Sequence, residues 1–390
     1  MLTTQDFSLV LGGPLFLLLR RAHLSDDAST VVRKRIVVIS LFCWLPLLVV
    51  SAVQGRALGG VGVPFLLDLE LHIRFLVAVP LLIVAELVVH QRMRNVVQQF
   101  HERRLVPDDA KSRFDAAIEA AFRLRNSTLA EVFLIAVVYV VGIEVIFKHY
   151  TVLNATTWSA TPGPDGPVLS VAGIWYTYVS LPIFQFLLIR WYFRIFMWAR
   201  FLWQVSRIEL NLVPTHPDRL GGLGFLAATV NAFAPLAAAH GTVVAAQLAS
   251  RIFYSGAKLT DFKAQAFALV AIMVCIVFGP LLVFSPQLAA CRRKGMREYG
   301  VLAQRYVREF EAKWLRGGAA PDEELIGSGD IQSLNDLNGS FDIVRSMRLA
   351  LWTKESIIQL AMVTLAPLVP LALTMMPLEQ LLKELFGILF

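Results

Sequence analysis

The chain has 390 residues, of which 56% are hydrophobic, with a mean hydropathy of +0.62 and a formal net charge of +7. A chain of this length ordinarily forms two or three soluble domains, but this hydropathy excludes that class and predicts a polytopic membrane protein. Cys43, Cys275 and Cys291 show no CxxC spacing, so neither a disulfide framework nor a zinc site is expected.

The apolar segments predict an all-α integral membrane protein, a polytopic helical bundle of about seven spans with two cytoplasmic amphipathic helices. About 20 apolar residues in a helix cross the roughly 30 Å core of a bilayer. The predicted spans are residues 36–53, 71–90, 129–147, 171–209, 223–250, 264–283 and 357–376. Residues 7–19 are too short to span and are expected to be interfacial or re-entrant. Pro367 and Pro370 leave open whether 357–376 spans or re-enters.

The spans and the charged segments between them divide the chain into seven parts. They are an N-terminal segment (1–35), the first two spans (36–90), a cytoplasmic amphipathic helix (91–126), the third and fourth spans (127–209) with a periplasmic loop (148–170), a Gly-rich loop with the next two spans (210–290), a cytoplasmic basic helix with a linker (291–355), and a last span with an amphipathic tail (356–390). In the first amphipathic helix, Phe114, Ala117, Ile118, Ala121 and Phe122 form one apolar stripe.

Basic residues gather between alternate spans. Segments 1–35, 91–126, 190–219 and 291–354 hold 29 of the 36 Lys and Arg. The positive-inside rule therefore predicts a cytoplasmic N-terminus. The same distribution explains the positive net charge, so no nucleic-acid partner is expected and the predicted partner is the lipid bilayer.

The fifth predicted span, 223–250, carries no charged side chain and combines small with polar residues. Small residues recur every four positions and would let another helix approach closely, in an intramolecular contact: Ala237, Gly241, Ala245 and Ala249. Asn231, His240 and Gln247 place polar groups at membrane depth, and Pro235 interrupts the hydrogen-bond ladder beside Asn231. We expect this helix to lie inside the bundle, with the polar groups either bonded between helices or lining a pathway.

Four further ionisable residues fall within or near the predicted spans: Arg74, Glu86, Glu131 and Glu144. Such groups are costly in lipid and mark either ion pathways or ion pairs. As a pathway, they would join Asn231, His240 and Gln247. As local pairs, Glu86 would meet His90 and Glu144 would meet Lys148, each four residues on.

The loop Pro214–Phe225 is the most specific motif. His216, Asp218 and Arg219 precede Gly221, Gly222 and Gly224, whose backbone N–H groups at a helix start would suit a small anion such as phosphate or a halide. In the alternative interpretation, Asp218 is an N-cap and the helix runs through the glycines as a close-packing stripe. One His and one Asp fall short of a metal-ligand set.

This loop also resembles a signature, HPDRxGGLGF, of an uncharacterised family of bacterial multi-pass inner-membrane proteins. The resemblance extends to Ser340–Phe341, Val344–Arg348 and the Leu- and Pro-rich end. It implies a bacterial inner-membrane location and carries no catalytic role with it.

The function expected from these features is a channel or transporter for an ion or small solute. Proline-interrupted spans and buried polar groups favour it, and no catalytic motif such as GxSxG, HExxH or Walker A is present. The alternative is a membrane-embedded enzyme acting on a lipid or phosphorylated substrate, with His216 and Asp218 as acid and base and Arg219 as anion clamp. A third possibility is an assembly or signalling partner. No cofactor and no metal are expected, and the oligomeric state is not predicted.

Overall fold

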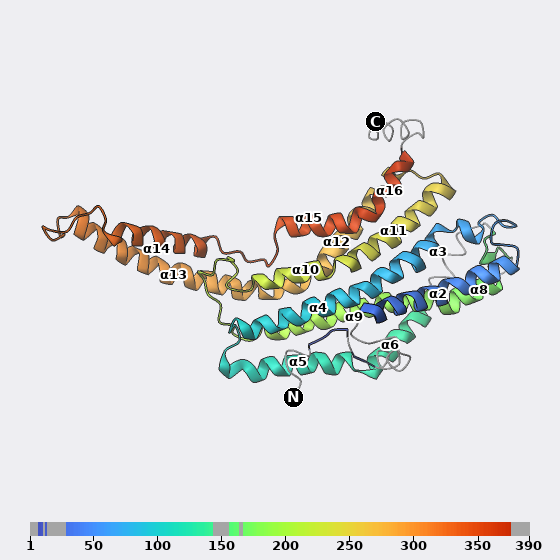
Figure 1. Cartoon of the computed structure of the whole chain (residues 1–390), viewed down its shortest axis with the longest axis horizontal. Helices are drawn as coiled ribbons and strands as arrows, with labels where there is room; N and C mark the ends of the chain where they lie inside the picture. Colours follow the sequence, from blue (N-terminus) through green and yellow to red (C-terminus); the bar gives the residue numbers. More distant parts are fainter. Residues whose placement is uncertain (1–6, 11, 14–28, 143–155, 164–166, 376–390) are drawn as a thin grey trace.

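The computed structural model describes residues 7–10, 12–13, 29–142, 156–163 and 167–375. Its helices lie roughly along one axis and form an elongated bundle (Figure 1). Six of the described helices are long and apolar enough to cross a membrane, or seven if a bent pair counts as one span. They are Val32–Val53, Leu69–Glu102, Val171–Val205, Gly224–Ser255, Leu259–Leu315 and Lys354–Ala372, with Asp108–Arg125 and Thr128–Gly142 as the bent pair. The all-α prediction is confirmed, and these helices indicate a polytopic membrane protein.

Most of these long helices are assembled from shorter pieces. Only the first, α2 (Ser29–Val53), continues through its proline, Pro46. The others change helix type near Pro80, Pro182, Pro235, Pro280, Pro367 and Pro370, because proline lacks the N–H that the ladder needs. The pieces are, in order, α3 (Leu69–Ile73), η3 (Arg74–Ala78) and α4 (Val79–Glu102); α8 (Val171–Trp175), η6 (Tyr176–Ser180) and α9 (Leu181–Val205); η7 (Gly224–Ala227), α10 (Ala228–Ala232) and α11 (Ala234–Ser255); η8 (Leu259–Phe262), α12 (Lys263–Phe278), η9 (Gly279–Phe284), α13 (Ser285–Phe310) and η10 (Glu311–Leu315); α15 (Lys354–Leu365), η11 (Ala366–Leu368), α16 (Val369–Ala372) and η12 (Leu373–Met375).

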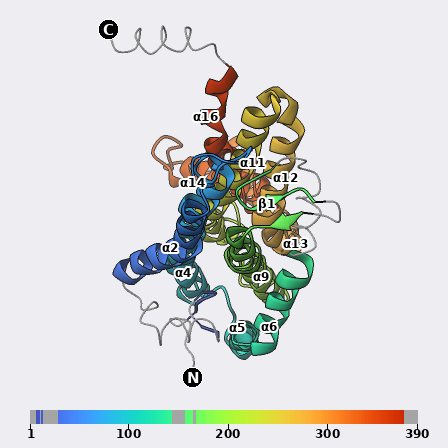
Figure 2. The ribbon, with the colours of Figure 1, turned by 90° about the vertical axis from the view of Figure 1, so that its right-hand side faces the viewer.

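The amphipathic helix α5 (Lys111–Arg125), which follows η4 (Asp108–Ala110), lies along the bundle on the side opposite α11 and α16 (Figure 2). Its predicted apolar stripe is buried, which confirms the periodicity argument. The chain then bends by 49° into α6 (Thr128–Val137) and η5 (Val138–Gly142). The rest of the third predicted span, including Glu144, lies outside the described residues.

The segment expected to be a loop at 148–170 contains a small antiparallel hairpin. Strands β1 (Ala160–Thr161) and β2 (Val168–Leu169) pair with Ala160 opposite Leu169. A Cβ at Gly173 would collide with the carbonyl oxygen of Ser159, so glycine lets α8 start directly against the hairpin. This hairpin is a correction to the sequence analysis, which placed no strand there.

The fifth long helix is the central one, as its composition predicts. In its most apolar stretch 61% of the residues are buried, compared with 22% in the first span. Ala237, Gly241, Ala245 and Ala249 are all buried. At Gly241 a Cβ would meet the backbone of Thr364, with its carbonyl carbon at 3.0 Å, and the ring of Pro367 at 3.3 Å. The small-residue stripe therefore serves close contact between α11 and α15 within one chain.

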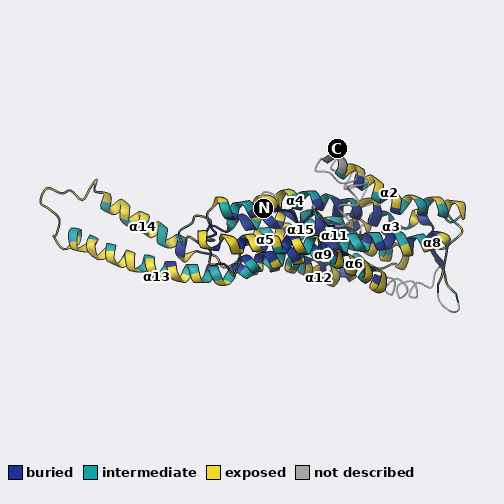
Figure 3. Ribbon diagram, turned by 90° about the horizontal axis from the view of Figure 1, so that it is seen from below, coloured by how far each residue is buried: buried dark blue, intermediate teal, exposed yellow. Residues whose placement is uncertain are grey.

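A helical arm projects from one end of the bundle (Figure 1). It consists of α13 with η10 and of α14 (Gly329–Arg345), and most of its surface is exposed (Figure 3). At its tip the carboxylate of Asp330 accepts hydrogen bonds from Lys313 Nζ and Trp314 Nε1, both at 2.9 Å. The sequence analysis predicted α13 and the linker but missed α14, which packs along α13.

The described part of the N-terminal segment is buried. The ring of Phe7 lies 5.9 Å from that of Phe122 and 5.1 Å from that of Phe201. The backbone carbonyl of Ser8 accepts a hydrogen bond from Arg125 Nη1 at 2.8 Å. Most of residues 7–19 and the tail 376–390 lie outside the described residues, so the predictions for them stay predictions.

Candidate functional site

A cluster of charged side chains is buried where α2, α4 and α9 meet. Glu86 on α4 pairs with Arg35 of α2 through Oε2 and with Arg194 of α9 through Oε1, the latter at 2.7 Å. All three residues are at most 9% exposed. Each carboxylate oxygen therefore has its own guanidinium, an arrangement that compensates charge in a low-dielectric interior.

A second pair extends this cluster to α6. Arg190, one turn before Arg194, has Nη2 3.7 Å from Oε1 of Glu131. The guanidinium of Arg194 also lies 4.9 Å from the ring centroid of Trp191. Three arginines and two glutamates give these five side chains one excess positive charge. We call Arg35, Glu86, Glu131, Arg190 and Arg194 the inner cluster.

A different polar group lies towards the other end of the same helices. Arg74 on η3 pairs with Glu70 of α3 and donates to the hydroxyl of Tyr176 on η6. Its guanidinium lies 5.6 Å from the ring centroid of Phe184. Arg74 precedes Glu86 by 12 positions, which is about 18 Å along a helix. We call Glu70, Arg74 and Tyr176 the outer cluster.

Buried hydroxyl groups lie on α2 and η6, along the same helices as the two clusters. Ser180 donates to the carbonyl of Cys43 at 2.7 Å, which fixes the register of the two helices. Ser40 and Ser51 on α2 and Thr177 on η6 are buried, and their hydroxyl oxygens have no hydrogen-bond partner among the described residues. A polar atom buried without a partner is costly, and such sites are where proteins retain internal water.

The polar residues of the fifth helix lie in different environments. Nε2 of His240 forms a hydrogen bond of 2.7 Å with the hydroxyl of Tyr192, and Nδ1 of His240 lies 2.8 Å from the carbonyl oxygen of Leu236. Asn231 and Gln247 are exposed on the surface of the bundle. The structure therefore does not bring these three residues together.

The loop before the fifth helix is a cradle of backbone N–H groups around the carboxylate of Asp218. Its Oδ1 accepts from Leu220 N at 2.7 Å and from Gly222 N at 3.2 Å, and its Oδ2 accepts from Gly224 N at 2.8 Å. Gly221 and Gly222 have φ of 64° and 98°, and Arg219 has φ of 55°. The left-handed backbone turns these amides towards one point.

This geometry decides one of the two interpretations of the loop. The helix starts at Gly224, so the prediction of a helix running from Arg219 through the glycines is wrong. The physical reason is the positive φ of Arg219, Gly221 and Gly222, since a right-handed helix needs negative φ at every residue. The non-helical cradle is present, and its amides already donate to the carboxylate of Asp218. The binding of a free anion stays a prediction.

Two neighbours complete the loop. Nδ1 of His216 lies 2.9 Å from Asp218 Oδ1. The carbonyl of Arg219 accepts from the backbone N–H of Arg348 at 2.9 Å, which joins the loop to the segment after α14. Burial alone would raise the pKa of the Asp218 carboxyl, but hydrogen bonds from Leu220, Gly224, Gly222 and His216 outweigh it and lower that pKa. A carboxylate held this way is a poor general base.

Three of the eight residues in the two clusters, Arg74, Glu86 and Glu131, were predicted from their depth in the spans. Arg35, Arg190 and Arg194 entered only the count of basic residues that predicts the topology. The pairing of Glu86 with His90 is wrong, because His90 Nδ1 instead lies 2.9 Å from Ser8 Oγ. The spacing of Arg190 and Arg194, four residues apart in an apolar helix, was the available signal. Glu70 carried no comparable signal.

No group of three or more His, Cys, Asp or Glu that could hold a metal ion occurs in the described part of the chain. Comparison of this chain with family models, with curated proteins and with solved structures returns no match. The evidence for a function of this chain therefore comes from the two clusters and from the buried hydroxyl groups on the same helices.

Proposed function

We propose that this chain is a bacterial inner-membrane transporter for protons or a small ion, with its N-terminus in the cytoplasm. The basic residues on one side of the predicted spans support the orientation. In that orientation the inner cluster lies near the cytoplasmic surface and the outer cluster near the periplasmic surface. The path between them follows the contact of α2 with η3, α4, η6 and α9.

The observation that carries the proposal is the set of unpartnered buried hydroxyls on the helices that hold the two buried ion-pair clusters. Ser40, Ser51 and Thr177 need water to complete their hydrogen bonds, and water bridging hydroxyl groups can carry a proton. The outer and inner clusters place ionisable carboxyl groups at the two ends of that path. Phe75 and Leu82 are at most 1% exposed in the same region, which favours a proton over a larger solute.

The structure also weakens the enzyme alternative for this chain. That alternative needs Asp218 as an acid or base, yet its carboxylate accepts three backbone hydrogen bonds.

The test is proton flux in liposomes containing the purified protein and a trapped pH-sensitive dye. A potassium gradient with valinomycin supplies the membrane potential. Flux is compared between the parent, Ser40→Ala and Thr177→Val. Both substitutions remove a buried hydroxyl without a partner, so they should leave stability equal or higher while lowering flux.

Thr242→Val is the matched control, because it removes a buried hydroxyl from α11 that donates to Ala238 O at 2.7 Å. Its flux should equal that of the parent. Parent liposomes that carry no more protons than empty liposomes would refute the proposal. Equal flux in the parent, Ser40→Ala and Thr177→Val would refute the path.

A further inference from the structure

We call residues 289–297 of α13 the root of the helical arm; they end a charge-free run that is long enough to cross a bilayer. Residues 264–291 contain no charged side chain, and 28 helical residues rise about 42 Å. A bilayer with its headgroup regions is about 40–45 Å thick. The first charges after this run, Arg292, Arg293 and Lys294, therefore reach the membrane surface as α13 leaves it.

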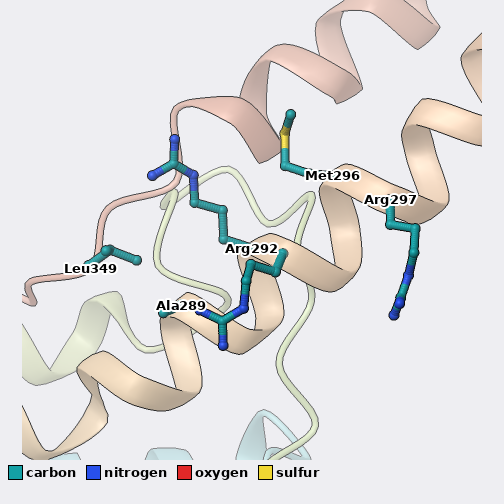
Figure 4. Close-up of a pocket in the computed structure, with 6 residues that line it drawn as sticks. Ala289, Arg292, Met296, Arg297 and Leu349 are labelled. Carbon is teal, nitrogen blue, oxygen red and sulfur yellow. The ribbon is translucent and has the colours of Figure 1, made fainter.

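An open pocket of about 500 Å³ occupies this root. Its walls come from α13 and from Leu349, in the segment that joins α14 to α15 (Figure 4). Met296 and Leu349 give it an apolar part, and Leu349 is 41% exposed. Arg292, Arg293 and Arg297 give it a cationic rim. The pocket is thus amphipathic, with guanidinium groups beside an apolar surface.

Two of the three cations of this rim, Arg293 and Arg297, form no ion pair within the described structure. Arg292 is anchored, because its Nη2 donates to the carbonyl of Arg345 at 2.8 Å. Arg293 and Arg297 are exposed and form no ion pair with any described carboxylate. Glu298 is the single acidic residue in the stretch 285–304. The rim therefore presents positive charge that is available to a ligand.

Charge is separated along the arm. The tip, residues 317–328, contains Asp322, Glu323 and Glu324 and no Lys or Arg. An anionic membrane surface attracts basic segments within about one Debye length and repels acidic ones. This polarity matches an arm whose root contacts the membrane and whose tip extends into water.

We propose that the pocket at the root of the arm binds the headgroup phosphate of an anionic phospholipid. The planar guanidinium forks of Arg293 and Arg297 suit phosphate oxygens, which they can engage in bidentate hydrogen bonds. Met296 and Leu349 contact the apolar part of the lipid next to the headgroup. This proposal is independent of transport, since it concerns a different face of the chain.

The test uses the full chain in mild detergent at about 0.15 M salt, where the Debye length is about 8 Å. Thermal stabilisation is titrated with phosphatidylglycerol, with zwitterionic phosphatidylcholine and with inorganic phosphate. The variant is Arg293→Gln with Arg297→Gln. The matched control is Arg305→Gln with Arg308→Gln, which removes the same charge from the same helix about 17 Å further along.

Phosphatidylglycerol should stabilise the parent at lower concentrations than phosphatidylcholine does. The pocket variant should need about tenfold more phosphatidylglycerol, through the loss of two charge-assisted contacts, and the control should respond as the parent does. If the control needs as much additional phosphatidylglycerol as the pocket variant, diffuse charge attraction explains the binding and the site is refuted. Equal stabilisation by inorganic phosphate would overturn the lipid assignment, and an unchanged response in the pocket variant would overturn both.

Discussion

The close contact of α11 with α15 requires glycine at position 241, where a hydrogen atom stands in place of a side chain. A Cβ at this position would meet the carbonyl oxygen of Thr364 and, at 3.0 Å, its carbonyl carbon. These atoms belong to the backbone of α15, so the whole helix must move to make room. Overpacking of this kind costs about 1–3 kcal/mol.

The expected result of Gly241→Ala follows from two opposing effects. Replacing glycine by alanine inside a helix favours folding by about 0.5–1 kcal/mol. Subtracting this gain from the packing cost leaves a net loss of up to about 2.5 kcal/mol in the free energy of unfolding. Gly339 in α14 is the matched control, because it is exposed and a Cβ there would meet no atom within 4 Å.

The measurement is urea unfolding in mild detergent, followed by tryptophan fluorescence. Gly339→Ala should raise the free energy of unfolding, and Gly241→Ala should lower it, so the two variants should move in opposite directions. If both variants are at least as stable as the parent, α11 and α15 are not in close contact, and the central position of the fifth helix is wrong.

Three further outcomes are expected. Glu86→Gln should lower stability by about 3–5 kcal/mol, since Arg35 and Arg194 lose their carboxylate, whereas exposed Glu102→Gln on the same helix should change thermal stability by less than about 0.5 kcal/mol. Asp218→Ala should cost about 1–3 kcal/mol because three amides lose their acceptor, and formate should restore part of that loss in the variant alone. The folded-state pKa of Asp218 lies below its ordinary 3.8, so its stabilisation should be complete above that pH and decline below it; acid unfolding of Asp218→Asn should lack this contribution.

The arrangement of the spans was largely predictable, because a charge-free run of sufficient length has few alternatives to a transmembrane helix. The predicted first span, 36–53, ends where α2 ends, at Val53. That the spans continue without a break into the charged segments was not predictable in the same way. Helix α4 continues to Glu102, and α13 extends past Arg292 to Phe310, because polar residues such as Gln and Arg sustain a helix in water as well.

Helix α14 shows why a soluble element of a membrane protein is harder to predict. Its sequence contains Asn335, Asn338 and Gly339, which lower helix propensity, and only Val344 is buried within it. Its stability comes from packing along α13 and from the contacts of Asp330 at the tip, which involve Lys313 and Trp314. Contacts between residues this far apart in the sequence follow from the fold and not from local pattern.

The inner cluster shows the same limit for the site. The four-residue spacing along one helix predicts His90 as the partner of Glu86. The actual partners, Arg35 and Arg194, are on two other helices. Counting basic residues for topology treated these arginines as interfacial, although Arg194 is 3% exposed. A positive charge near the end of an apolar helix has two outcomes, exposure at the membrane surface or an ion pair within the bundle. Only the packing of helices decides between them.

The outer cluster, in contrast, follows from a pattern that the sequence does contain. Pro80 and Pro182 each lie six residues after a polar side chain, Arg74 and Tyr176. Each proline lacks an N–H and crowds the carbonyl four residues before it, and the preceding turn widens to π geometry: Val79 N donates to Arg74 O, and Leu181 N to Tyr176 O. Because the two helices carry equivalent turns at the same level, the first residues of those turns meet, and Arg74 donates to Tyr176. The positions of two prolines thus determine where a buried arginine finds its partner.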